Sequence, residues 1–195
     1  MAPEKKEAVD QNVSEEGFKV YTKMLKRQHD VYLGDSVLDD TSAYNDLMNL
    51  LKTEVEREDV VNIYLSNIGG SVTVGLRLCQ AMKQCQGTIV VHAEAECQSM
   101  GAIISLCGDA LVLYPGAFLM FHNYSIGYAG KGGEFHMASG EYQRQFKEIM
   151  EHCCYPFLSK AEINKLAEDK DAYIHPTDDD LKKRLKRHFK RMEVK

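Results

Sequence analysis

The chain has 195 residues, 44% of them hydrophobic, and a formal net charge of −5 at pH 7. This length and apolar content support one sizeable core, so we expect a single domain over residues 18–180 and exclude two full domains. The charge is uneven, because residues 181–195 hold eight Lys or Arg and one Glu, a local +7, while the rest of the chain carries −12. An acidic body argues against a general nucleic-acid-binding protein, so nucleic acid is not an expected partner.

The N-terminal residues 1–17 are charged and lack the apolar run of a secretory signal, so we expect a flexible segment. The six cysteines lie mostly in apolar segments, and no two form a C-x-x-C pair. This pattern argues against a zinc site and a redox motif, and it favours reduced, buried thiols in a cytoplasmic protein. We expect no metal and no cofactor. No window approaches about 18 consecutive apolar residues, so we expect no membrane span.

In the first half of the chain, apolar strands alternate with amphipathic helices. In order, we expect a weak helix at 18–27, a strand and turn at 30–37, a helix from 41 or 42 to 55, a strand at 60–65, a helix ending at Gly87, and a strand at 88–91. This alternation implies right-handed crossovers and a mainly parallel sheet covered by helices. The predicted fold class is therefore α/β.

The second half continues with two strands and several helices. We expect strands at 110–114 and 117–121, a glycine-rich loop or hairpin after His122, a long helix at 138–153, a short capped helix at 159–168, and an acidic loop at 169–180. The last fifteen residues form either a basic amphipathic helix or a loose tail. This tail is a nucleic-acid patch, a partner-binding helix or, as is commonest for charged termini, a solvated end.

Ser99 stands between the strand at 88–91 and an apolar run that resumes at Ala102 as a packed helix would. At such a turn a serine Oγ can point into a cleft, while the unpaired N–H groups of the helix N-terminus face negative charge on a bound carbonyl. The ordinary alternative is a serine that caps the helix. This stretch alone leaves both interpretations open.

Three other features have residue types suited to the same chemistry. The Gly69-Gly70 turn follows a buried strand, where ligands bind in α/β sheets, although paired glycines are common in turns. His122 leaves the end of an apolar strand and has a pKa suited to a general base, yet a histidine there is commonly structural. Asp171 could orient such a histidine, as serine hydrolases require, but nothing local distinguishes it from Asp169.

Taken in order, four motifs resemble ClpP, the family of proteolytic subunits of the ATP-dependent Clp protease. They are IGGSVTVG at 68–75, QSMGA at 98–102, LMFH at 119–122 and DAY at 171–173. The resemblance covers about residues 18–175. It implies the ClpP/crotonase-like fold of ββα superhelical units, with the helix at 138–153 as a protruding handle.

The resemblance also implies roles for individual residues. Ser99 would be the nucleophile, His122 the general base and then acid, and Asp171 the residue that orients the imidazole. Backbone N–H groups of Gly70 and Met100 would form the oxyanion hole. Extended substrate would pair with the main chain of two segments, one that contains Ser71 and Val72 and one that contains Asn123 and Tyr124.

The implied assembly is a homo-oligomer of two stacked heptameric rings, a tetradecamer that encloses the active sites. Its substrates are unfolded polypeptides, usually delivered by a AAA+ unfoldase, with no membrane involved. Some positions depart from the family pattern: Ile68 replaces a proline, Asn123-Tyr124 replaces Gln-Pro, and the basic tail has no counterpart. These departures fit a divergent or phage-encoded member.

The function that these features favour is a self-compartmentalising serine endopeptidase. One alternative is a non-catalytic ring or assembly subunit with a misaligned triad, since spacing does not establish geometry. The other is an acyl-CoA-processing enzyme of the same superfamily fold, which also builds an oxyanion hole from two backbone N–H groups but commonly lacks the ordered Ser, His and Asp. For the endopeptidase, deleting residues 181–195 is expected to leave hydrolysis of small peptides intact.

Overall fold

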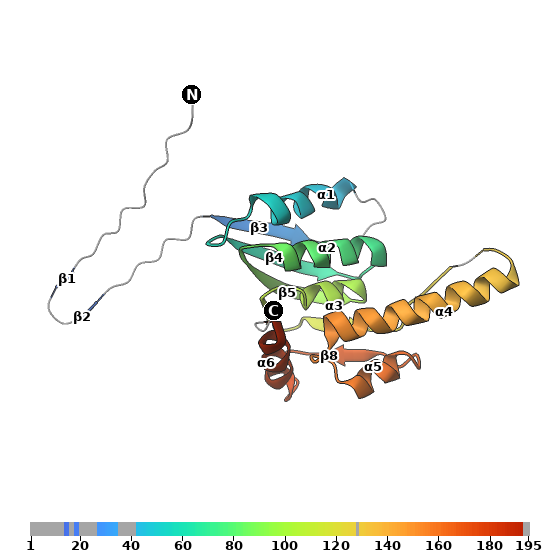
Figure 1. The fold of residues 1–195 in the computed structure, drawn as a ribbon. Helices are drawn as coiled ribbons and strands as arrows, with labels where there is room; N and C mark the ends of the chain where they lie inside the picture. Colours follow the sequence, from blue (N-terminus) through green and yellow to red (C-terminus); the bar gives the residue numbers. More distant parts are fainter. Residues whose placement is uncertain (1–13, 16–17, 20–26, 35–41, 128, 193–195) are drawn as a thin grey trace, which may run out of the picture.

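The computed structural model describes residues 14–15, 18–19, 27–34, 42–127 and 129–192 (Figure 1). Its centre is a six-stranded sheet with the order β3-β4-β5-β7-β8, in which β6 also pairs with β5. The strands are β3 (Gln28–Leu33), β4 (Val60–Asn67), β5 (Thr88–Gln98), β6 (Ala110–Leu113), β7 (Phe118–Phe121) and β8 (Ala172–Ile174). Every pair is parallel except β7 with β8, which confirms the predicted α/β class.

One face of the sheet is covered by three helices (Figure 1). They are α1 (Ser42–Asn49) with its π-helical continuation η1 (Leu50–Glu54), α2 (Val72–Gln84) and α3 (Met100–Ser105). Alternate aliphatic residues of β4 (Val61, Ile63 and Leu65) have no exposed surface and belong to the same apolar core as these helices. The period of two in β4 and the apolar stripes of the helices therefore bury one continuous core.

The other sheet face carries a row of aromatic rings on neighbouring strands. Tyr32, Tyr64 and His92 occupy paired register positions of β3, β4 and β5, with ring centroids 4.9 and 4.8 Å apart. Tyr114 extends the row, with its centroid 6.1 Å from that of His92. Tyr32 is 73% exposed, so the row presents an aromatic surface to the outside.

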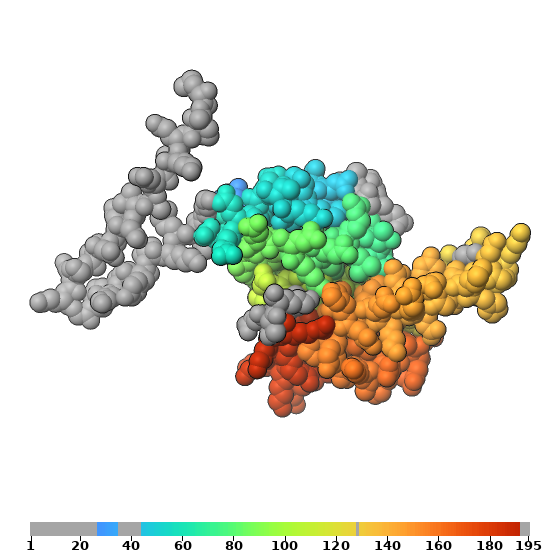
Figure 2. Space-filling view, in the orientation of Figure 1, coloured from blue at the N-terminus to red at the C-terminus, as the bar shows by residue number. Residues whose placement is uncertain are grey.

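The C-terminal half supplies α4 (Gly132–Ile149) with its π-helical end η2 (Met150–Cys154), and α5 (Lys160–Leu166). The first part of α4 projects away from the body (Figures 1 and 2). The helix begins at Gly132, so the prediction of a start near 138 was wrong. The physical reason is a cap: the Lys131 N–H donates to the Glu134 carboxylate at 3.2 Å, and Glu134 is an acidic residue in the first turn.

Residues 181–195 contain α6 (Leu181–Met192), which packs on the domain. Leu181 and His188 are buried, and His188 Nε2 lies 2.8 Å from the Leu106 carbonyl oxygen. Arg184 pairs with Glu162 of α5 at 2.7 Å. The sequence favoured a solvated terminus, whereas α6 uses one face to cover the core.

Other differences from the sequence analysis concern local boundaries. The strand predicted at 88–91 continues to Gln98, because the second half of β5 pairs with β7. The acidic segment at 169–180 contains β8, whose Ile174 is buried. Phe18–Lys19 is a strand, β2, paired with β1 (Ser14–Glu15), while the rest of the helix predicted at 18–27 lies almost entirely outside the described residues. In the described part of the chain, no helix is long and apolar enough to cross a membrane.

Candidate active site

Ser99 lies at the junction of β5 and α3 in a conformation that L residues rarely adopt, with φ 54° and ψ −121°. Two backbone hydrogen bonds hold it: its N–H donates to the Met120 carbonyl of β7 at 2.8 Å, and its own carbonyl accepts from the Ile103 N–H at 3.2 Å. Such strain costs on the order of 1–3 kcal/mol and is retained mainly at functional sites. The Ser99 side chain makes no capping hydrogen bond to α3, so the N-cap alternative does not explain this serine.

Glycines allow the turn after β4 to lie directly against Ser99. Gly69 has a φ of +95°, and a Cβ at this position would lie 2.7 Å from Ser99 Cβ and 3.0 Å from the Met100 nitrogen. A Cβ on Gly101 would overlap the carbonyl of Asn67. The Gly69-Gly70 turn and the start of α3 therefore approach more closely than any larger side chains permit.

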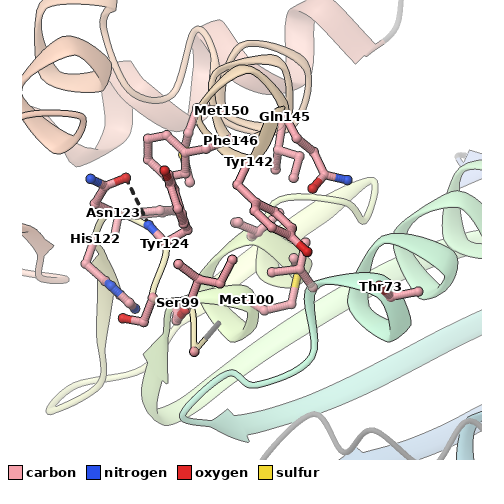
Figure 3. A pocket seen from close by; sticks show the side chains of 17 residues that line it. Thr73, Ser99, Met100, His122, Asn123, Tyr124, Tyr142, Gln145, Phe146 and Met150 are labelled. Carbon is pink, nitrogen blue, oxygen red and sulfur yellow. Dashed lines mark hydrogen bonds between the residues drawn. The ribbon is translucent and has the colours of Figure 1, made fainter. Parts of the chain in front are cut away.

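Ser99 and His122 line one cavity of about 280 Å³ (Figure 3). In Figure 3 the half-buried His122 side chain extends from the end of β7 toward Ser99. The helix α4 and η2 form the opposite wall. The apolar residues that line the cavity include Val72, Met100, Ile103, Phe121, Phe146, Ile149 and Met150. The structure thus brings the predicted nucleophile and base to a pocket that suits an apolar side chain.

Asp171 is exposed and immediately precedes β8. Ala172 pairs with Phe121 in the antiparallel β7–β8 ladder. Continuing this register by one residue places Asp171 opposite His122. Its competitor Asp169 has a φ of 59° and accepts a hydrogen bond from Asn123 Nδ2 at 2.8 Å. Among the residues that the structure describes, no hydrogen bond or ion pair joins Ser99, His122 and Asp171.

The predicted oxyanion-hole donors lie on the two adjoining segments. Met100 is the first residue of α3, where backbone N–H groups lack helical partners, and Gly70 has a φ of 133° in the neighbouring turn. Of the predicted substrate-binding residues, Val72, Asn123 and Tyr124 line the cavity. Ser71 is not among the lining residues; its hydroxyl accepts from the Val74 N–H at 3.4 Å and caps α2.

Residues 122–127, where the sequence predicted pairing with substrate, have no regular secondary structure. Tyr124 connects this segment to α4, because its hydroxyl donates to the Ser139 carbonyl at 3.3 Å. Its ring lies 6.0 Å from that of Phe146. The loop after His122 is therefore held against α4.

The sequence did not assign α4 to the site. Tyr142, Gln145 and Phe146 line the cavity. The sequence predicted only a helix with an apolar stripe at 138–153, and the resemblance implied a protruding handle there. Asn67, between β4 and the glycine turn, was also missed. The sequence signal for Asn67 was a polar carboxamide side chain at the end of a buried strand, two residues before Gly69-Gly70.

The cysteines offer no competing nucleophile near Ser99. All six are free thiols. Burial raises the pKa of Cys97, two residues before Ser99, to about 12, and burial also raises the pKa of Cys154. Since the thiolate is the reactive form, these thiols are poor nucleophiles at neutral pH.

The structure thus combines a mainly parallel α/β sheet with a strained serine at a strand-to-helix turn, and this serine lines the same cavity as His122. The chain matches the family model described as Clp protease over residues 12–178, and it belongs to that family. This finding confirms the resemblance seen in the four motifs.

One curated relative is ATP-dependent Clp protease proteolytic subunit 3, chloroplastic, from Arabidopsis thaliana. The two are 30% identical over 148 residues, which cover 74% of this chain and 43% of the relative. The chain therefore aligns with less than half of that protein's length.

Proposed function

We propose that this protein is a serine-type endopeptidase that hydrolyses unfolded polypeptides or short peptides. The observation that carries the proposal is Ser99: its backbone is strained, its hydroxyl does not cap α3, and it lines the same cavity as His122. Membership of the Clp protease family supports the same chemistry.

In the proposed mechanism, Ser99 Oγ attacks the scissile carbonyl and forms the acyl-oxygen bond, while His122 accepts the hydroxyl proton. His122 then donates that proton to the leaving amine as the C–N bond breaks. In the second half of the reaction, His122 takes a proton from a water molecule that attacks the acyl carbon, and it returns this proton to Ser99 Oγ as the acyl–oxygen bond breaks. The N–H groups of Met100 and Gly70 stabilise the oxyanion, each donor contributing about 3 kcal/mol to lowering the barrier. Asp171 orients the imidazole and stabilises its charged form.

This chemistry requires the three side chains to come within hydrogen-bond distance when substrate binds. Such bonds are often long or absent without substrate and tighten in the reacting complex. The missing contacts among the described residues Ser99, His122 and Asp171 favour a second candidate, a non-catalytic subunit that serves assembly. Activity measurements separate the two.

The proposed assembly is a homo-oligomer of stacked heptameric rings that contact one another through α4. Phe135, Met137 and Tyr142 are 45%, 70% and 43% exposed on this projecting helix, and exposed apolar groups of this kind mark contact surfaces. For a AAA+ unfoldase partner, we propose that the aromatic row of Tyr32, Tyr64, His92 and Tyr114 is the docking surface. Tyr32 and Tyr114 are exposed, and Tyr64 and His92 between them are half-buried. A cytoplasmic location also remains a proposal; the relative's name places that protein in the chloroplast.

The test is hydrolysis of a short fluorogenic peptide by the wild type, Ser99→Ala and Ser125→Ala, with the oligomer mass of each sample measured by light scattering. Ser125 is an exposed serine that lines the same cavity, so its variant controls for removing a hydroxyl there. The proposal predicts that only Ser99→Ala loses activity while it keeps the wild-type mass. An assembled but inactive wild type would favour the non-catalytic subunit.

A further inference from the structure

Asn67, the last residue of β4, is one of the few buried polar residues in the part of the chain that the structure describes, and it is 1% exposed. Both ends of its carboxamide are bonded. Nδ2 donates to the carbonyl of Gly34, just after β3, at 3.1 Å, and Oδ1 accepts from the N–H of Gly69 at 2.9 Å. The side chain therefore connects the end of β3 to the glycine turn.

The backbone of Asn67 touches the other half of the site. It pairs in register with Cys97 of β5, after an irregularity between Leu65 and Asn67. Its carbonyl occupies the space where a Cβ on Gly101 would lie. One residue thus contacts both segments from which the proposed oxyanion hole is built, the Gly69-Gly70 turn and the first turn of α3.

The carboxamide has only one favourable orientation. A half-turn of the amide would place Oδ1 against the Gly34 carbonyl and Nδ2 against the Gly69 N–H, which sets acceptor against acceptor and donor against donor. In a buried site both contacts are costly. Gly69 and Gly70 have φ values of 95° and 133° and no side chains that would restrict their backbone. The hydrogen bond from the Gly69 N–H to Asn67 Oδ1 therefore restrains a turn whose own residues are conformationally permissive.

We propose that Asn67 is a positioning residue that fixes the Gly69-Gly70 turn relative to Met100 and so pre-organises the oxyanion hole. This inference rests on the proposed peptidase function. Asn67 does not line the cavity, so it acts through the turn and touches no substrate. Because the hole binds the oxyanion of the transition state more strongly than the substrate carbonyl, losing its alignment lowers kcat and leaves KM nearly unchanged.

Two variants separate positioning from stability. Asn67→Ala removes both hydrogen bonds and is expected to lower kcat at least tenfold. Asn67→Asp keeps an acceptor for the Gly69 N–H but sets a carboxylate against the Gly34 carbonyl. We therefore expect Asn67→Asp to be no more stable than Asn67→Ala to denaturant, yet to recover part of the lost kcat. A merely structural residue would give activities in the same order as stabilities.

The experiment measures kcat and KM for a fluorogenic peptide, the inhibition constant of a matching peptide aldehyde, and the denaturation midpoint of each variant. The aldehyde forms a hemiacetal with the serine and places its oxygen in the hole. Asn62→Ala is the matched control, since Asn62 lies on the same strand and its Nδ2 bonds to Asp30 at 2.8 Å, away from the cavity.

We expect Asn67→Ala to weaken aldehyde binding by the same factor as it lowers kcat, and Asn62→Ala to change neither. An active wild type with unchanged kcat and aldehyde affinity in Asn67→Ala would overturn this inference alone. A wild type that neither cleaves the peptide nor reacts with a fluorophosphonate at Ser99 would overturn the proposed function and, with it, this inference.

Discussion

Replacing Gly69 by alanine tests how closely the turn and Ser99 must approach. The added methyl would lie 2.7 Å from Ser99 Cβ, 2.9 Å from the Gln98 carbonyl oxygen and 3.0 Å from the Met100 nitrogen. Two of these neighbours are backbone atoms, which cannot rotate away as a flexible side chain would. The turn, the serine or both must therefore shift.

Gly116 provides the matched control. Its φ of +87° resembles the +95° of Gly69, but a Cβ at Gly116 meets nothing within 4 Å. In both variants an alanine must adopt a positive φ, which lowers the free energy of unfolding by about 1–2 kcal/mol. Only Gly69→Ala adds the steric overlap, so it is expected to be less stable than Gly116→Ala.

The larger difference is expected in activity. Displacing one oxyanion-hole donor typically lowers kcat by about 10² to 10³, equivalent to roughly 3–4 kcal/mol of barrier. We expect a loss of this size in Gly69→Ala and wild-type kcat in Gly116→Ala, measured by peptide hydrolysis alongside urea denaturation. If the two variants matched in both stability and kcat, the close approach described at Ser99 would be refuted.

Three further predictions concern stability and reactivity. Deleting residues 181–195 is expected to lower the thermal midpoint and reduce peptide hydrolysis, because the inner face of α6 covers the core; an unchanged midpoint would restore the expectation of a dispensable tail. Burial alone would raise the pKa of Glu162, but hydrogen bonds from Arg184 and Ser159 outweigh it and lower the pKa to about 2. Its ionised form therefore stabilises the fold fully above about pH 4.5, and this contribution is lost as the pH falls toward 2, so denaturation of Glu162→Gln should depend less on pH across that range; equal slopes would contradict it. In iodoacetamide labelling at pH 8 followed by peptide mapping, Cys85, which is only partly buried, should react before the fully buried Cys97; the reverse order would contradict the burial described here.

Much of the fold follows from periodicity in the sequence. The β-branched run of β4 and the apolar spacing of α1 and α2 gave the elements and the parallel sheet, because burial on a sheet face or helix stripe selects those periods. The boundaries that differed depend on partners distant in the chain. The polar second half of β5 is a strand because β7 lies beside it, and β8 forms in an acidic segment because it pairs with β7 and buries Ile174 in the core.

The site shows the same division between local and tertiary information. The positions of Ser99 and His122 at element ends were readable, because Ser99 stands between an apolar strand-like run and an apolar helix-like run and His122 directly follows an apolar strand. The α4 wall of the cavity was not, since an apolar stripe does not reveal what it faces. The role inferred for Asn67 was hidden as well, because it comes from contacts with Gly34 and Gly101, each more than thirty positions away.

The most direct test of the central claim is labelling with a fluorophosphonate, followed by proteolysis and mass spectrometry to locate the adduct. The wild type is expected to carry one adduct, on the peptide that contains Ser99, and His122→Ala is expected to label far more slowly. No adduct on Ser99 in the assembled wild type, or equal labelling rates in the wild type and His122→Ala, would contradict a nucleophile activated by His122.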